Sequence, residues 1–190
     1  IDLILKELDL DGSFIQDIIQ PGFDTICFYT YKVQNAKTVL ICTSQNAVRI
    51  NETRRKIVKN EKPLRFMEFL KSKIKGARIN CVNQIGKSRI IKFSLSHCDS
   101  EYFLYARLWS NASNVILCDK NNVILDSMFR RPQKNEVTGG IFVIPEQSEN
   151  SEKVWPVRDF SMIQKEYDES NSFKKNLSLN EKVDIWYSEH

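Results

Sequence analysis

Residues 63–93 change their hydrophobic period from that of a helix to that of strands, and this change constrains the fold more than any other feature. Phe66, Leu70 and Ile74 recur at every fourth position, with mostly charged or polar residues between them. This spacing predicts a helix with one buried face. A proline precedes the pattern and a glycine follows it, and these residues favour the start and the end of a helix.

Alternating patterns predict strands after this helix and along most of the chain. Residues 78–81 and 91–95 alternate apolar and polar side chains, with the Gly-Lys-Ser of residues 86–88 as their turn. Similar short, β-rich runs lie at residues 14–19, 25–31, 39–42, 47–50, 102–109, 114–119 and 123–128. Turns are expected at Pro21-Gly22, at Asn35-Ala36 and over residues 119–122. With a short helix over residues 2–10, we expect an α+β fold, a mainly antiparallel β-sandwich or flattened barrel with flanking helices.

Positive charge is concentrated in one part of the chain. Residues 49–92 contain 14 Lys or Arg and three acids, a net charge of +11, whereas the remainder contains 14 bases and 21 acids, a net charge of −7. A concentrated positive field of this kind suits a polyanion such as RNA. The alternative is that these bases are ordinary solvated faces of the helix and the hairpin.

The cysteines and histidines do not form a recognisable metal or catalytic pattern. The five cysteines are odd in number and lack C-x-x-C spacing, so we expect reduced core thiols and no zinc site. His97 is expected in a loop, and no nucleophile and base constellation can be assembled around it. No apolar run is long enough to span a bilayer, and no signal peptide is visible. We expect a cytoplasmic protein without a cofactor or a membrane partner.

Five motifs occur in a fixed order between Gly12 and Pro145. The first two are Gly12-Ser13-Phe14-Ile15-x-x-Ile18-x-Gln20-Pro21 and Arg49-Ile50-Asn51-x-Thr53. The third runs from Pro63 to Ile91 and consists of Pro63-x-x-Phe66, Leu70, Gly76-Ala77-Arg78-Ile79, Gln84 and Ser88-Arg89-Ile90-Ile91. The last two are Ser113-Asn114-Val115-Ile116-Leu117 and Gly139-Gly140-Ile141-Phe142-Val143-Ile144-Pro145. In this order they resemble the NFACT N-terminal domain of the RqcH and NEMF family, whose bacterial members were once called fibronectin-binding protein A.

The resemblance implies a fold and a function. The fold would be similar to the N-terminal domain of the formamidopyrimidine-DNA glycosylases. The function would be that of an RNA-binding module in ribosome-associated quality control, which engages tRNA on an obstructed large ribosomal subunit. Family members extend the stalled peptide without a template, and this tailing requires an Asp-Arg pair. Here that pair is Ser88-Arg89, so the carboxylate is missing.

The same resemblance implies a division of the chain. Residues 1–146 would form the NFACT N-terminal domain, residues 147–177 a polar linker or extension, and residues 178–190 the start of a C-terminal helix that begins with an S-x-x-E capping box. In complete family members the chain continues into a coiled coil and an RNA-binding domain. These domains of the same full-length chain are the partners that we expect, together with tRNA and the large ribosomal subunit.

Seven residues are the candidates for RNA contact. Arg89 presents a guanidinium fork suited to phosphate, and we expect it to act with Ser88, Lys87, Arg78, Arg49, Lys71 and Lys75. For Arg89 the alternative is a place along the rim of the core with its head in water. For Arg49 the alternative is that the residue only ends a strand. The basic loop of residues 54–59 that follows is, however, able to track an RNA backbone.

Two other function classes are weighed against RNA binding. Glycosylases of similar fold use an N-terminal Pro-Glu pair with the proline amine as nucleophile, and Ile1-Asp2 cannot take that role, so we expect no enzyme activity. A surface adhesin for fibronectin or fibrinogen is the second alternative, as the older family name implies. It would require export, which the absence of a visible signal sequence disfavours.

Overall fold

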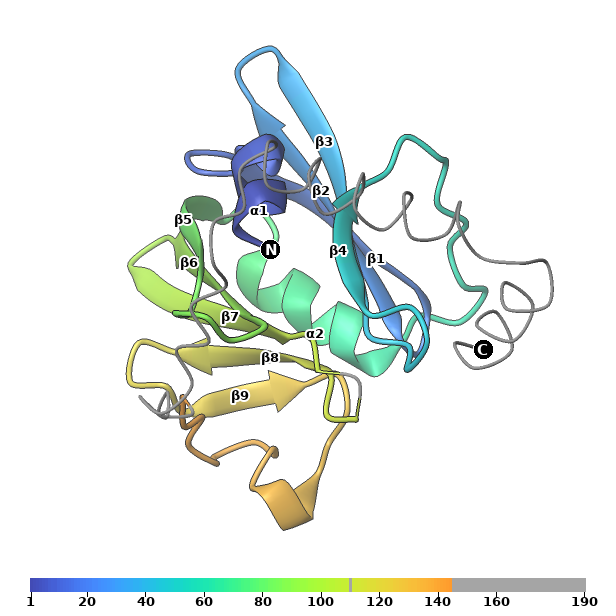
Figure 1. The fold of residues 1–190 in the computed structure, drawn as a ribbon. Helices are drawn as coiled ribbons and strands as arrows, with labels where there is room; N and C mark the ends of the chain where they lie inside the picture. The colour runs from blue at the N-terminus through green and yellow to red at the C-terminus, as the bar shows by residue number, and fades with distance from the viewer. Residues whose placement is uncertain (110, 145–190) are drawn as a thin grey trace, which may run out of the picture. The chain divides into compact units, whose positions relative to one another are not determined.

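Nine strands form one antiparallel sheet in the part of the chain that the structure, a computed structural model, describes: residues 1–109 and 111–144 (Figure 1). In sheet order the strands are β4 (Arg49–Glu52), β3 (Asn35–Cys42), β2 (Thr25–Lys32), β1 (Phe14–Gly22), β5 (Arg78–Gln84), β6 (Ile90–His97), β7 (Ser100–Arg107), β8 (Asn114–Asp119) and β9 (Ile124–Ser127). The helices are α1 (Asp2–Leu8) and α2 (Arg65–Ile74), with the 3-10 turn η1 at Pro132–Lys134.

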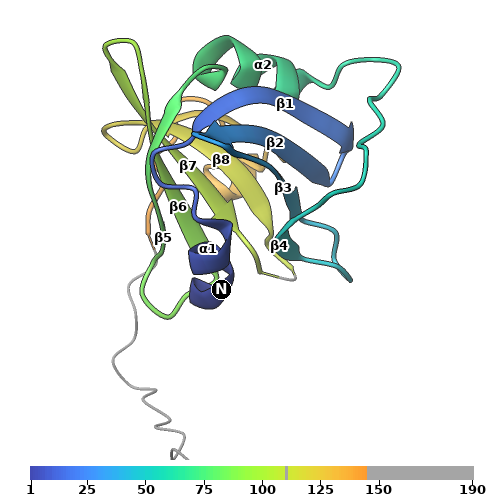
Figure 2. The same cartoon turned by 90° about the horizontal axis from the view of Figure 1, so that it is seen from above.

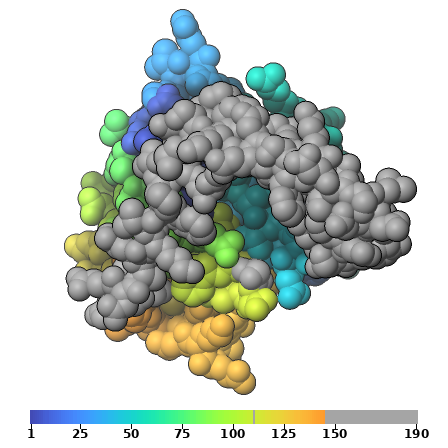
Figure 3. Space-filling view, in the orientation of Figure 1, coloured from blue at the N-terminus to red at the C-terminus, as the bar shows by residue number. Residues whose placement is uncertain are grey.

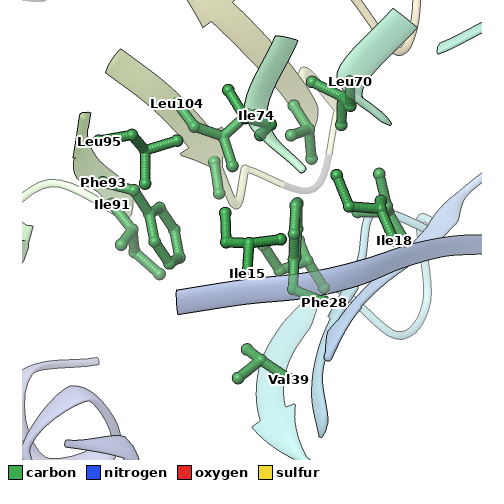
Figure 4. Packing of buried hydrophobic residues seen from close by; sticks show 14 of the residues in the cluster. Ile15, Ile18, Phe28, Val39, Leu70, Ile74, Ile91, Phe93, Leu95 and Leu104 are labelled. Atoms are coloured by element: carbon green, nitrogen blue, oxygen red, sulfur yellow. The ribbon is translucent and has the colours of Figure 1, made fainter. Parts of the chain in front are cut away.

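The sheet divides into two halves at the junction of β1 and β5. Only Phe14 and Arg78 pair across this junction, whereas the neighbouring strand pairs align over most of their length. The two halves share one core, in which Ile15 and Phe28 of the first half lie close to Phe93 of the second (Figure 4). Because β4 and β9 do not pair, the sheet is not closed. The predicted α+β fold, mainly antiparallel and sandwich-like with flanking helices, is confirmed.

Helix α2 lies beside β1, as Figure 2 shows, and also contacts β6 and β9. Phe66 is 2% exposed, and Leu70 and Ile74 are fully buried, as their four-residue spacing predicted. After the helix, Gly76 adopts a φ of 84° and its N–H donates to the carbonyl of Ile15 at 2.7 Å. The segment after α2 therefore joins the edge of β1 and leads directly into β5.

Two predicted turns are displaced by about two residues. Pro21-Gly22 and Asn35-Ala36 belong to strands, and the turns lie instead at residues 23–24 and 33–34. Gln34 has a φ of 61°, which supplies the left-handed residue that a two-residue hairpin needs. The irregular register between Ile19 and Gly22 accommodates a proline, which cannot donate to the ladder. The turn between β2 and β3, in blue, projects from the surface in Figure 3.

The N-terminal helix and some polar residues also differ from expectation. α1 ends at Leu8 rather than continuing to Leu10, because Asp9 is left-handed. Cys27, Cys42 and Cys118 are buried as predicted, but Cys81 and Cys98 are exposed, since both lie on solvent-facing parts of β5 and the β6–β7 turn. All five cysteines are free. His97 ends β6 instead of lying in a loop.

A buried polar network ties the segment after β9 to β7 and β8. Nη2 of Arg107 lies 2.5 Å from Oε1 of Glu136, and Nδ2 of Asn114 lies 2.8 Å from Oε2 of the same carboxylate. Ser113 donates to the carbonyl of Thr43 at 2.6 Å. The Ser-Asn motif therefore has a structural role, joining segments that are distant in sequence.

The chain divides into two compact units, Ile1–Gln147 and Ser148–His190, and every described residue lies in the first. The predicted linker at residues 147–177 and the predicted helix from residue 178 lie outside the described residues.

Candidate nucleic-acid interface

The β5–β6 turn carries three of the candidate residues, Lys87, Ser88 and Arg89, which we call the hairpin tip. Ser88 donates its hydroxyl to the carbonyl of Ile85 at 2.7 Å, and Gln84 donates its amide to the carbonyl of Ser88 at 2.6 Å. The hydroxyl at the position of the family Asp is thus used within the turn. It orders the turn rather than the neighbouring arginine.

Arg89 is exposed, and its backbone carbonyl accepts a hydrogen bond from the N–H of Leu108 at 2.7 Å. Its guanidinium makes no hydrogen bond or ion pair within the described residues. The backbone of Arg89 is therefore held while its charged head is available to an anion.

Lys71 and Lys75 lie one helical turn apart on α2 and face Asp17 of β1. Nζ of Lys71 is 3.0 Å from Oδ1 of Asp17, and Nζ of Lys75 is 3.9 Å from the same oxygen. Burial raises the pKa of Asp17, but the contact with Lys71, the Ile18 N–H and the charges of both lysines outweigh it, so the pKa is lowered. Since the carboxylate is ionised at neutral pH, the group of Lys71, Lys75 and Asp17 has a net charge of +1.

Arg78 lies exposed at the first residue of β5, opposite Phe14 on β1 and Ser96 on β6. The hairpin tip follows the other end of this strand. Six residue steps of about 3.3 Å separate the two ends of β5, so they are about 20 Å apart. The structure therefore does not bring Arg78 and Arg89 into one site.

Arg49 lies at the start of β4 and lines an open cavity of about 470 Å³. Arg55, Lys56 and Lys59 of the following loop line the same cavity. We call this cavity, with its four bases, the basic cavity. The remaining lining residues are Pro21, Leu40, Asn51, Thr53, Ile57, Val58 and Asn60, so no acid is among the described residues around it. The loop is the teal segment that leaves β4 in Figure 1.

The guanidinium of Arg49 is held by its neighbours. Its Nε donates to Oδ1 of Asn51 at 3.2 Å, and its Nη1 donates to the carbonyl of Ala47 at 3.0 Å. Asn51 thus orients the arginine from two residues away. The sequence predicts Arg49 and the basic loop of residues 54–59 as possible RNA contacts, and the structure brings Arg49, Lys56 and Lys59 to one cavity.

The described residues contain no cluster of three or more His, Cys, Asp or Glu that could hold a metal ion. Nδ1 of His97 lies 2.8 Å from the carbonyl of Lys73. This contact gives the histidine a structural partner at the end of α2. In the region that the structure covers, no helix is long and apolar enough to cross a membrane.

Comparison with known proteins places the chain in a family. The family model that matches describes the NFACT N-terminal and middle domains and covers residues 2–182. No curated protein matches the chain.

Several solved structures share the fold. The N-terminal part of the fibronectin/fibrinogen-binding protein from Streptococcus suis is 23% identical with a TM-score of 0.73, covering 85% of this chain and 65% of that one. The N-terminal domain of the fibronectin-binding protein PavA from Streptococcus pneumoniae is 21% identical with a TM-score of 0.71 and the same coverage. The fibrinogen-binding protein from Staphylococcus aureus is 20% identical with a TM-score of 0.66, covering 79% of this chain and 55% of that one.

The present chain therefore spans about 65% of the length of the first two solved structures. At these identities the likeness concerns the fold. The family resemblance that the five motifs predicted is confirmed, and the chain belongs to the family of NFACT N-terminal and middle domains.

Proposed function

We propose that this chain is the RNA-binding module of a cytoplasmic, ribosome-associated quality-control factor that engages tRNA on obstructed large ribosomal subunits. The observation that carries the proposal is the basic cavity. Four bases from β4 and its following loop surround one opening, and no acid stands among its described lining residues. Such a site suits the phosphates of an RNA backbone.

The lining of the basic cavity supports this role chemically. Arg49 is oriented by Asn51 and Ala47, so its guanidinium is arranged before a phosphate arrives. Lys56 and Lys59 supply charges on flexible stems. Asn60 donates to the carbonyl of Gln20 at 3.5 Å, a long contact that holds the loop near β1. This mixture contacts phosphates without reading base identity.

The proposed role is binding without catalysis. The hairpin tip, with Arg89 exposed, is a second contact for RNA, and the helix edge with Lys71, Lys75 and Arg78 is a third. The coiled coil and the RNA-binding domain of the full-length chain would supply further contacts to tRNA and the large subunit. Because Ser88 replaces the family Asp and its hydroxyl is used within the turn, peptide tailing is the part of the family function that depends most on this position.

Equilibrium binding of tRNA to the 190-residue chain at several salt concentrations tests the proposal. Lys56→Glu with Lys59→Glu should weaken binding at least tenfold at 0.1 M salt and reduce the salt slope by about two, since two phosphate contacts are lost. Lys120→Glu with Lys134→Glu makes the same charge change at exposed lysines elsewhere. Equal losses from the two pairs would show that net charge alone governs binding, and the cavity would not be the RNA site.

A second candidate, adhesion to fibronectin or fibrinogen, is favoured by the names of the solved structures that share this fold. Binding of immobilised fibronectin or fibrinogen to the same chain separates it from the first. Tight, salt-insensitive binding to either protein, with no binding to tRNA, would support the adhesin.

A further inference from the structure

We propose that the outer face of β1 and β2 is a stacking surface for unpaired bases of single-stranded RNA, with Phe14 and Tyr31 as its two rings. The inference rests on the proposed RNA-binding function and adds a second kind of contact to it, with bases instead of phosphates. We call Phe14, Gln16, Tyr29 and Tyr31 the aromatic face.

The strand register places these rings side by side. Arg78, Phe14, Tyr31 and Ala36 are successive cross-strand partners on β5, β1, β2 and β3. Cross-strand partners project from the same side of a sheet with their Cβ atoms about 5 Å apart. Ile15 and Thr30, the next pair, are buried, so the row that contains Phe14 and Tyr31 faces outward.

Both rings are accessible. Phe14 is 44% exposed and Tyr31 is 46% exposed. The two exposed rings lie beside each other, and contiguous apolar surface of this kind is found at binding sites. A planar base would cover ring area that the described residues leave open.

A hollow of about 480 Å³ adjoins the ring of Tyr31 and is lined by Gln16, Tyr29, Thr30, Tyr31, Ala36, Lys37 and Thr38. Within the described residues, the amide of Gln16 and the hydroxyls of Tyr29 and Tyr31 make no hydrogen bond. These neutral groups are able to donate to and accept from the edge of a base. Lys37 does not take this role, since its Nζ donates to the carbonyls of Glu7 and Leu8.

Positive charge borders the aromatic face on the side of β5 and α2. Arg78 is the cross-strand partner of Phe14. Nη2 of Arg78 lies 3.9 Å from the position that a Cβ atom on Gly12 would occupy, so the guanidinium lies beside the backbone that leads into Phe14. In the next outward row Asp17 is the partner of Tyr29 and faces Lys71 and Lys75. Stacking rings with cations along one border are the arrangement that single-stranded RNA requires.

An aromatic groove of this kind also suits a proline-rich peptide. The charge favours RNA, because a peptide in an extended proline helix gains little from the cations at the border. RNA uses both the rings and the cations.

Binding of a ten-residue oligouridylate and of a ten-base-pair RNA duplex to the 190-residue chain tests the inference. Phe14→Ala with Tyr31→Ala should raise the Kd for oligouridylate at least tenfold, since two stacking rings are lost. The Kd for the duplex should change less than twofold, and the salt slope for both should be unchanged. Phe23→Ala removes a ring that is even more exposed, from the β1–β2 turn, and should change neither Kd.

Phe14→Trp keeps a ring at the site and reports stacking even if the double variant folds poorly. Its fluorescence should be quenched by saturating oligouridylate, relative to the unsubstituted chain. Unchanged oligouridylate affinity in the alanine variant, or quenching of the tryptophan by polyproline peptide and not by RNA, would overturn the inference. If tRNA still binds through the basic cavity in that case, the proposed function stands without this surface, whereas a lack of any RNA binding by the unsubstituted chain would refute both.

Discussion

Two arginines show how burial separates structural from functional charge. Arg107 is almost buried and is held by Glu136 and by the carbonyl of Ala112 at 2.6 Å. Arg89 is exposed and makes no such contact within the described residues. The side chain of Arg107 thus contributes to folding, and that of Arg89 is available to a partner.

Arg89→Ala should weaken tRNA binding without lowering the free energy of unfolding by more than about 1 kcal/mol, the usual limit for a surface side chain. Arg107→Ala is the matched control and should cost more, about 3 kcal/mol, since it removes the nearer of the two arginines, Arg107 and Arg131, that pair with the buried carboxylate of Glu136. Urea unfolding of both variants, with tRNA titrations of the first, makes the comparison. A large loss of stability in Arg89→Ala with unchanged tRNA binding would place this arginine at the rim of the core.

Two buried cysteine thiols and one buried tyrosine hydroxyl are weak acids that should make the folded chain less stable at high pH. Burial raises the pKa of Cys27 to about 11, with a further contribution from Cys42. Burial likewise raises the pKa of Cys118 to about 12, helped by Asp119, and that of Tyr105 to about 12, helped by Cys118. These groups stay protonated in the folded chain where the unfolded chain has lost the proton.

Stability should therefore be complete below about pH 8.5 and fall as the pH rises toward 11, by up to about 1.4 kcal/mol per pH unit and group. Chemical unfolding between pH 7 and pH 10.5 measures this fall. Cys118→Val removes one titrating group and should reduce the slope, whereas Cys81→Val changes an exposed thiol and should not. Identical slopes in the two variants would contradict the assignment.

At the scale of elements, α2 was predictable and the hairpin turns were less so. Phe66, Leu70 and Ile74 recur every four residues between a proline and a glycine. These local features predict both the helix and the face that is buried. The turns depend on the pairing register, which is set by strands on both sides. Gln34 has a left-handed conformation that glutamine does not favour, whereas asparagine is common in turns, so local sequence predicts the turn at Asn35-Ala36.

Phe66→Ala tests the importance of α2 for the shared core. The ring is 2% exposed and packs in the cluster that joins both halves of the sheet. Its loss should lower the free energy of unfolding by about 3 to 5 kcal/mol. Glu68→Ala, at an exposed position of the same helix, should change it by less than about 0.5 kcal/mol. Similar midpoints for the two variants in urea would contradict the role of α2 as part of the core.

At the scale of the whole molecule, the sequence predicts the concentration of positive charge but not its division in space. Residues 49–92 hold a net charge of +11, and the fold separates them into the hairpin tip, the helix edge and the basic cavity. The aromatic face arises from the pairing of β1 with β2 and β5, which no local pattern around Phe14 indicates. Long-range topology therefore decides which of the predicted residues act together.

Sedimentation of the native protein tests the central claim, a role on the large ribosomal subunit, most directly. Cells that produce the protein are lysed at low salt, and the lysate is separated on a sucrose gradient, with the protein followed by an antibody against this chain. We expect it to sediment with free large subunits and to move to the top of the gradient at high salt, because phosphate contacts weaken as salt rises. Recovery of the protein at the cell surface, with none in the ribosomal fractions at low salt, would contradict the proposed function.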